Sequence, residues 1–293
     1  MAEARRLKEL AARVISLADL PDGALVVALS GGADSAALLW TCVRLGRQVS
    51  TVHVHHGLAA SDLMEAAAES VAAQLGVPLT ISRVEVGTGA SPENQAREAR
   101  YRAFVDTAKA GEWILTAHTS DDQAETVIDH LLRASGLDGL SGIPARRPPF
   151  ARPLLAVARS ETRELATLAG LPWRDDPVNE DPDPLRNRIR RRLIPALEAA
   201  YNPRMRQSLA TTAALVARDT QHLEELVGKA PVIETEAGAE VAAAVISTAA
   251  PALAARIVRR LLTVAGLPAA SSGSVVGVLA VATGAVPSYE PGG

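Results

Sequence analysis

The chain has 293 residues, a single cysteine and a formal net charge of −3. This length suffices for a sizeable core and two domains. One cysteine excludes an intrachain disulfide and any cysteine-based cluster, and no apolar run approaches the roughly 20 residues that a membrane span needs. Because the net charge is small, any nucleic-acid site must be a local patch. We therefore expect a cytoplasmic protein that is not embedded in a membrane.

The first half of the chain alternates strand and helix patterns. Residues 1–20 mix charged and apolar side chains at helical spacing, which indicates an amphipathic helix instead of a signal peptide. Apolar, β-branched runs predict strands over 24–29, 49–55, 79–84 and 113–117. Helical spacing predicts helices over 34–46, 62–75, 93–110 and 119–134. This order is typical of βαβ units, so we predict an α/β fold, a Rossmann-like parallel sheet with helices on both faces.

The second half has a different character. Residues 140–210 are rich in proline and hold thirteen arginines, no lysine and eight acids, which predicts a basic, loop-rich segment with short helices. Residues 207–228 and 251–265 return to helical spacing. We predict a catalytic domain over 1–200 and a smaller, mostly helical domain over 201–293. The latter should end in a flexible tail from Ser288.

The first predicted strand leads directly into the sequence Ser-Gly-Gly-Ala-Asp-Ser at residues 30–35. Two glycines allow a tight turn that brings backbone N–H groups close to a ligand, and the following helix adds its positive N-terminal end. These features predict a phosphate-binding loop. The carboxylate of Asp34 then needs a divalent cation such as Mg²⁺ between itself and the phosphates. The structural alternative is a strand-to-helix turn with a capping Asp-Ser pair.

A pair of acids follows the fourth predicted strand. Asp122 and Glu125 are three residues apart, so both carboxylates lie on one helical face. Two acids this close repel each other unless a cation lies between them. Ligands of parallel sheets bind beyond the carboxyl ends of the strands, which places this pair near the phosphate loop. A solvated helix face is the alternative interpretation.

Five sequence blocks resemble, in order, those of the tRNA(Ile)-lysidine synthetases, which belong to the PP-loop superfamily of ATP-pyrophosphatases. The resemblance covers about residues 20–200, and five blocks in series are a far more specific signal than one. The blocks are the loop at 30–35, residues 53–62, residues 94–101, residues 116–140, and residues 152–155 with 175–195.

The resemblance implies a definite reaction. ATP adenylates the C2 oxygen of the wobble cytidine in an isoleucine tRNA with a CAU anticodon, and pyrophosphate leaves. The ε-amine of free L-lysine then displaces AMP. The product, lysidine, pairs with A instead of G, so the tRNA reads AUA. The implied participants are ATP, Mg²⁺, lysine and this tRNA, and a homodimer is one expectation for the assembly.

The resemblance also implies roles for individual residues. Catalysis falls to Asp34, Arg97, Asp122 and Glu125; Asp122 and Glu125 also hold lysine, and Asp34 holds Mg²⁺ through the pyrophosphate. The residues expected at ATP are Ala28, Ser30, Gly31, Gly32, Ala33, Asp34, Ser35, His55 and His118. The residues expected at the tRNA are Arg133, Arg186, Asn187, Arg188, Arg190 and Arg191.

The arginine run also points to RNA on chemical grounds, since five arginines within residues 186–192 repel one another unless a polyanion is near. A solvated charged face is the simpler alternative. The domain over 201–293 is expected to add to tRNA binding. A target base that leaves its stack needs a flat partner, for which Tyr101 and Trp173 are candidates.

Three other functions stay open from the sequence. A tRNA thiolase of the same superfamily would need paired cysteines or an iron–sulfur cluster, and the chain has Cys42 alone. An adenylating synthetase for a small metabolite would not need the arginine-rich segment. A non-catalytic RNA-binding protein with a relic nucleotide fold would not need to keep Asp34, Asp122 and Glu125.

Overall fold

The computed structural model describes residues 1–57, 60–84, 92–176, 185–236, 238–267 and 271–290. The chain divides into two compact units, Met1–Leu215 and Val216–Gly293. This division falls inside helix α10 (Met205–Gly228), whereas the sequence prediction placed the boundary after residue 200. Among the described residues, no helix combines the length and the apolar character that crossing a bilayer requires.

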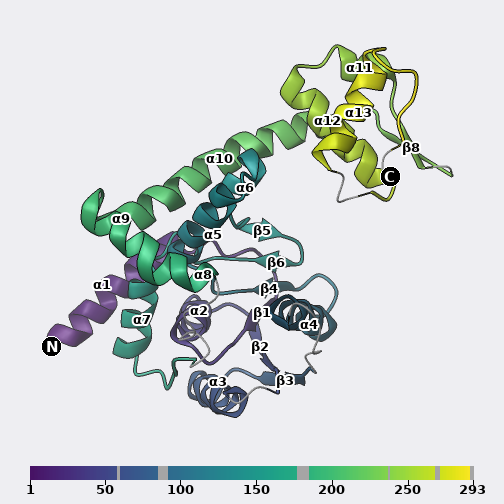
Figure 1. Ribbon diagram of the computed structural model, residues 1–293. Helices are drawn as coiled ribbons and strands as arrows, with labels where there is room; N and C mark the ends of the chain where they lie inside the picture. The colour runs from purple at the N-terminus through teal and green to yellow at the C-terminus, as the bar shows by residue number, and fades with distance from the viewer. Residues whose placement is uncertain (58–59, 85–91, 177–184, 237, 268–270, 291–293) are drawn as a thin grey trace. The chain divides into compact units, whose positions relative to one another are not determined.

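The first unit is built on a six-stranded sheet with the order β3-β2-β1-β4-β6-β5 (Figure 1). Neighbouring strands pair in parallel except at the β5 edge, where β5 and β6 are antiparallel. The predicted parallel sheet is therefore confirmed, with β1 between β2 and β4. The strands are β1 (Leu25–Ala28), β2 (Val49–His55), β3 (Leu79–Arg83), β4 (Trp113–Leu115), β5 (Arg146–Arg147) and β6 (Phe150–Ala151).

Helices cover both faces of this sheet, as predicted. Strand β1 shows why, because its successive side chains point to opposite faces. Leu25 and Val27 pack into a cluster with α1, α2, α3 and α7, whereas Val26 packs with Phe104 of α4. The helices are α1 (Ala2–Leu17), α2 (Ala33–Arg44), α3 (Ser61–Leu75), α4 (Pro92–Thr107) and α7 (Arg159–Leu168).

The arginine-rich segment is fastened to helix α5 by a separate apolar cluster. Ala124 and Ile128 of α5 pack against Ile189 and Ile194, which are 1% and 0% exposed. This cluster fixes the backbone of the segment, from which Arg186 and Arg190 reach the acids of α5 while Arg188, Arg191 and Arg192 are exposed. The elements are α5 (Ser120–Leu132), α6 (Gly136–Leu140), α8 (Leu185–Arg188), the π-helical turn η2 (Ile189–Leu193) and α9 (Ile194–Ala200).

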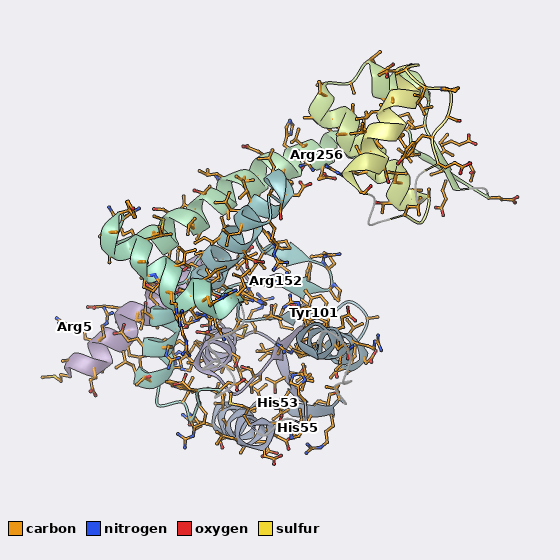
Figure 2. The ribbon with its side chains drawn as sticks, viewed as in Figure 1. Arg5, His53, His55, Tyr101, Arg152 and Arg256 are labelled. Carbon is orange, nitrogen blue, oxygen red and sulfur yellow. The ribbon has the colours of Figure 1, made fainter. Side chains whose placement is uncertain are left out.

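The second unit is mostly helical, as expected, and adds a hairpin that the sequence did not predict. Its core includes Val227, Ile257 and Val258. Arg256, labelled in Figure 2, pairs with Glu224 of α10 within this unit. Residues 291–293 of the predicted tail lie outside the described residues. The elements are the end of α10, β7 (Ile233–Thr235), β8 (Gly238–Glu240), α11 (Ala243–Ser247), α12 (Pro251–Val264) and α13 (Ser272–Ala282).

Candidate active site

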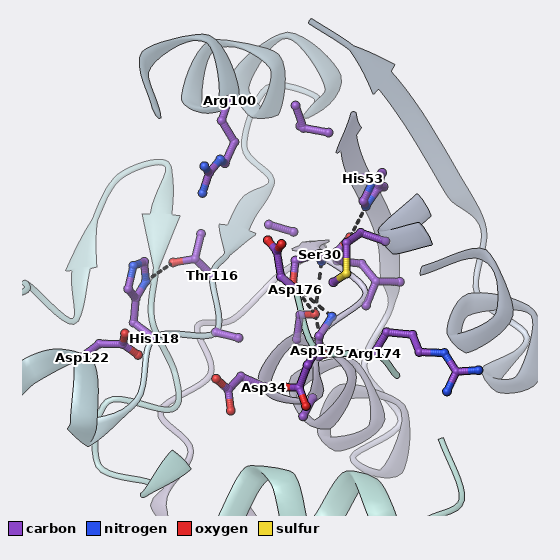
Figure 3. A pocket seen from close by; sticks show the side chains of 18 of the residues that line it. Ser30, Asp34, His53, Arg100, Thr116, His118, Asp122, Arg174, Asp175 and Asp176 are labelled. Carbon is purple, nitrogen blue, oxygen red and sulfur yellow. Dashed lines mark hydrogen bonds between the residues drawn. The ribbon is translucent and has the colours of Figure 1, made fainter. Parts of the chain in front are cut away.

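A pocket of about 700 Å³ lies at the carboxyl ends of β1, β2 and β4 (Figure 3). Parallel strands end at one edge of a sheet, so residues that are far apart in the sequence meet there. The structure brings many of the predicted site residues to its wall: Ala28, Ser30, Gly32, Ala33, Asp34, Ser35, Arg97, His118, Asp122, Arg190 and Arg191.

The loop after β1 has the geometry of a phosphate cradle. Gly31 has φ +87°, and a Cβ at this position would lie 2.4 Å from the carbonyl oxygen of Met64. The backbone N–H of Ser30 donates to Ser35 Oγ over 3.1 Å, and the two serine Oγ atoms are 3.0 Å apart. These bonds tie the turn together, and no side chain caps the start of α2. The first N–H groups of that helix therefore face the pocket as anion donors.

Asp34 stands in the first turn of α2, beside this cradle. The Thr162 hydroxyl donates to its Oδ1, and Arg159 Nε lies 3.5 Å from its Oδ2. Burial raises the pKa of Asp34, and the Thr162 hydrogen bond and the Arg159 charge oppose this shift. A divalent cation on the pocket side would favour the ionised form further. The donor set therefore fits a Mg²⁺ ion shared with phosphate oxygens.

The acid pair of α5 is buried and surrounded by arginines. Asp122 and Glu125 are 7% and 1% exposed. Arg159 Nη2 and Arg186 Nη2 lie 2.7 and 3.0 Å from Asp122 Oδ1. Arg186 Nε and Arg190 Nε lie 2.9 and 2.7 Å from the two oxygens of Glu125. The cation that the sequence required between the two acids is thus a set of three guanidinium groups.

These contacts decide the protonation state of the pair. Burial alone would raise the pKa of Asp122, but the charges of Arg159 and Arg186 and the hydrogen bond from the Thr119 backbone outweigh it and hold this pKa well below its usual range. Burial is likewise outweighed at Glu125, whose pKa is lowered by Arg190 above all. Both carboxylates remain ionised at neutral pH. Such weak bases favour holding a cation over abstracting a proton.

Two histidines of the pocket wall are neutral at physiological pH. Burial lowers the pKa of His118 to about 4, and its Nδ1 lies 2.9 Å from Thr116 Oγ1. Burial also lowers the pKa of His56 to about 4, with the Arg100 charge as a further cause. His118 therefore offers an uncharged ring to the pocket, beside Asp122.

Some predicted residues lie away from the pocket wall. His55 Nε2 is 3.0 Å from Asp62 Oδ1, and the N–H of Gly57 donates to its Nδ1 over 3.2 Å, so this ring secures the loop after β2. Arg133 pairs with Asp129 and is 64% exposed at its side chain, at the far end of α5 from the acid pair. Gly31, Glu125, Arg186, Asn187 and Arg188 are likewise not among the wall residues.

Aromatic stacking is present at the wall formed by α4. The Arg97 guanidinium lies 4.9 Å from the ring centroid of Tyr101, and the Tyr101 and Phe150 centroids are 4.9 Å apart. This stack supports Tyr101 as a flat partner for a base. The other candidate, Trp173, is stacked under Arg163 at 4.8 Å and is not among the wall residues.

Three arginines of the pocket wall were not predicted from the sequence: Arg159, Arg163 and Arg174. Arg159 bridges the phosphate loop and the acid pair, and the N–H of Arg174 donates to the carbonyl oxygen of Gly31 over 2.9 Å. The sequence feature that could have pointed to these arginines is the acid pair, because two neighbouring acids need compensating cations. The sequence could not show which of thirteen arginines supply them.

Comparisons with known proteins agree with this geometry. A family model described as a PP-loop domain matches residues 2–197. The tRNA(Ile)-lysidine synthase of Pseudomonas aeruginosa is 43% identical over 214 residues, 70% of this chain, and the chain spans about half (48%) of that relative. The synthase of Salinispora tropica is 45% identical over 72% of this chain and 67% of the relative. That of Thermobifida fusca is 38% identical over 87% and 81%.

One solved structure supports the fold. The U34-tRNA thiolase NcsA from Methanococcus maripaludis, with its [4Fe-4S] cluster, aligns with a TM-score of 0.58 over 74% of this chain and 79% of that chain. At 15% identity this likeness concerns the fold alone. With the phosphate loop, the acid pair and the matched length taken together, the chain belongs to the PP-loop proteins and, within them, to the tRNA(Ile)-lysidine synthase family.

Proposed function

We propose that this protein ligates free L-lysine to C2 of the wobble cytidine in CAU-anticodon isoleucine tRNA, using ATP, in the cytoplasm. The observation that carries the proposal is that the phosphate loop and Asp122, one of the two ionised acids, line the same pocket. One side chain spans both, since Arg159 contacts Asp34, Asp122 and Glu125. The reaction needs the same adjacency, because the adenylated base must meet lysine where it was made.

In the first step, the cytosine C2 oxygen attacks the α-phosphorus of ATP and the bond to pyrophosphate breaks. The N–H groups at the start of α2 and the hydroxyls of Ser30 and Ser35 hold the leaving pyrophosphate. Asp34 would hold Mg²⁺, which when bound neutralises charge that develops on the phosphate oxygens. Arg97 and Tyr101 would present the flipped base from α4.

In the second step, the ε-amine of lysine attacks C2, the C2–O bond breaks and AMP leaves. The amine arrives as an ammonium ion and loses protons as the C–N bond forms. Asp122 and Glu125 supply the negative charge that attracts it, because their pKa values keep them ionised. The ring of His118, whose pKa is lowered to about 4, lies beside Asp122 and stays uncharged, so it does not repel the ammonium, and the released protons pass to solvent.

The tRNA backbone would meet the arginine-rich segment 185–192. This segment holds five arginines and no acid, and Arg188, Arg191 and Arg192 are exposed. Residues 216–293, in contrast, carry five basic and seven acidic side chains. We propose that this second unit also contacts tRNA, through shape and individual side chains instead of a positive surface.

A tRNA thiolase is the competing activity on this fold, and the chemistry of Cys42 disfavours it. Cys42 is fully buried within α2, and burial raises the pKa of its thiol to about 12. The thiolate is the nucleophilic form, so this side chain is inert. No second cysteine exists in the sequence to receive or pass on sulfur.

The proposal is tested by following both products with two transcripts, CAU-anticodon isoleucine tRNA and elongator methionine tRNA. We expect pyrophosphate and AMP release, with labelled lysine incorporated, for the isoleucine transcript alone. The Asp34→Asn variant should lose pyrophosphate release by about 100-fold or more. AMP release without lysine in the tRNA would assign the second step to another nucleophile and refute the proposal.

A further inference from the structure

The three arginines around the acid pair are not equivalent. Arg159 is 19% exposed and reaches Asp34 as well as Asp122 and Glu125. Its backbone N–H also donates to Asp121 over 2.8 Å. It is built into the floor of the site. Arg186 has 40% of its side chain exposed and contacts Asp122 and Glu125.

The cluster is balanced before lysine arrives. The carboxylates of Asp34, Asp122 and Glu125 face three guanidinium groups, and the two acids of α5 are buried, at 7% and 1% exposure. An ammonium ion that joins them leaves an uncompensated positive charge in a poorly solvated site, which is strongly unfavourable. One resident cation must therefore move out when lysine enters.

Arg186 is the cation that can leave most easily. Its side chain is more exposed than those of Arg159 and Arg190, at 40% against 19% and 25%. Its movement requires no change in the backbone, because the segment is anchored through Ile189 and Ile194. Once released, the guanidinium lies on the segment that carries the exposed arginines of the proposed tRNA surface.

We propose that Arg186 is an exchangeable counter-ion: it holds the acid pair in the free enzyme, yields that place to the lysine ammonium, and then binds a tRNA phosphate. This inference rests on the proposed function. It couples the binding of the two substrates. Lysine releases Arg186 to bind a tRNA phosphate, and bound tRNA keeps Arg186 away from the acids that lysine binds. Thermodynamic linkage requires the two effects to be equal in size.

The coupling is measured on the full chain without ATP, so that nothing turns over. The readouts are the Kd for isoleucine tRNA with and without saturating lysine, and the Kd for labelled lysine with and without tRNA. In the wild type we expect each substrate to tighten the other by about fivefold or more. Independent or mutually weakening binding in the wild type would overturn the inference without any variant.

The Arg186→Gln variant separates this role from a structural one. It should bind lysine more tightly than the wild type in the absence of tRNA, bind tRNA more weakly, and show no coupling. The Arg186→Lys variant should retain part of the coupling, because it keeps a mobile cation. Weaker lysine binding by Arg186→Gln would make Arg186 a direct lysine ligand and overturn the inference.

Arg188 offers a matched control. It lies on the same short helix, is exposed, and has no recorded contact with the acid pair in the described structure. Arg188→Gln should weaken tRNA binding while leaving lysine affinity and the coupling unchanged. Wild-type lysine incorporation with ATP distinguishes the two levels of failure: no incorporation refutes the proposed function and this inference with it, whereas incorporation with coupling intact in Arg186→Gln refutes the inference alone.

Discussion

Gly31 shows how one residue sets the geometry of the phosphate loop. Its φ of +87° and the 2.4 Å approach of a hypothetical Cβ to the Met64 carbonyl oxygen leave no room for a side chain. At Gly32, in contrast, φ is −82° and the nearest atom, Ser30 Oγ, is 3.4 Å from a hypothetical Cβ. A side chain is therefore excluded at Gly31 by backbone conformation and packing, whereas Gly32 has room for a Cβ.

We predict that Gly31→Ala lowers the free energy of unfolding by roughly 1–3 kcal/mol, because it forces a strained backbone against Met64. Gly32→Ala should leave stability nearly unchanged and weaken ATP binding. Urea denaturation followed by tryptophan fluorescence measures the free energy of unfolding of the first unit, since Trp40, Trp113 and Trp173 all lie in it. Equal stability of the two variants would contradict the assignment.

The neutral histidines predict a pH dependence of stability. The pKa values of His56 and His118 are lowered to about 4 in the folded chain, so between about pH 6.5 and pH 4 the unfolded chain binds more protons. Their contribution to stability is complete above pH 6.5 and is lost as pH falls through 4. Acidification from pH 7 to pH 5 should lower the free energy of unfolding by on the order of 1 kcal/mol for each histidine.

The same fluorescence assay measures the free energy of unfolding at pH 7 and at pH 5. His56→Gln should lose less of this free energy between the two pH values than the wild type. The lowered pKa values of Asp122 and Glu125 act in a lower window, because their pairing contributes above about pH 4 and is lost below it. A wild-type stability that is flat from pH 7 to pH 5 would be inconsistent with buried neutral imidazoles.

At the scale of elements, the segment α8–η2–α9 matters because it carries arginines into the site on an apolar anchor. Ile189 is 1% exposed and packs against Ala124 and Ile128 of α5. Leu193, four residues on, is 37% exposed. Ile189 thus anchors the segment to α5, whereas the neighbouring Arg188 is exposed.

We predict that Ile189→Ala loosens this segment by about 2 kcal/mol or more, which corresponds to roughly 30-fold faster amide hydrogen exchange in α8 and α9. Leu193→Ala should change exchange by a few-fold at most. Hydrogen exchange measured by mass spectrometry compares the exchange rates of α8 and α9 in the two variants. Equal exchange in both variants would show that the segment is not held by the Ile189 contact.

Long periodic elements were predictable from the sequence, as was the three-residue strand β4 within its longer apolar run at 113–117, whereas most short elements were not. The predicted strand at 49–55 and the helix at 62–75 match β2 and α3 (Ser61–Leu75) almost residue for residue. Strands β5 to β8 have two or three residues each, too few to show a period of two.

For the whole molecule, charge distribution separates the two units. Salt should weaken tRNA binding through the phosphate contacts of segment 185–192, because each contact releases counter-ions. We predict that Arg188→Gln reduces the slope of log Kd against log salt by about 1. Arg259→Gln, an exposed change in the second unit, should leave the slope unchanged. Filter binding over a salt series measures both, and equal slopes would disprove the proposed division.

The location of the site could be predicted from the sequence, and its electrostatics could not. Residues 30–35, His118 and Asp122 were expected at neighbouring strand ends because topology alone brings them there. The pairing of Arg186 and Arg190 with the acid pair, instead of with solvent, depends on tertiary packing between residues 61 to 65 positions apart in the chain. No local pattern reports such a contact.

The central claim is that both half-reactions occur in this one pocket. The most direct measurement is nucleoside mass spectrometry of isoleucine tRNA after incubation with the full chain, ATP, Mg²⁺ and lysine. The account predicts a wobble cytidine that is heavier by one lysine less one water, formed by the wild type and lost in Asp122→Asn. An unmodified wobble cytidine in a reaction that has consumed ATP would contradict it.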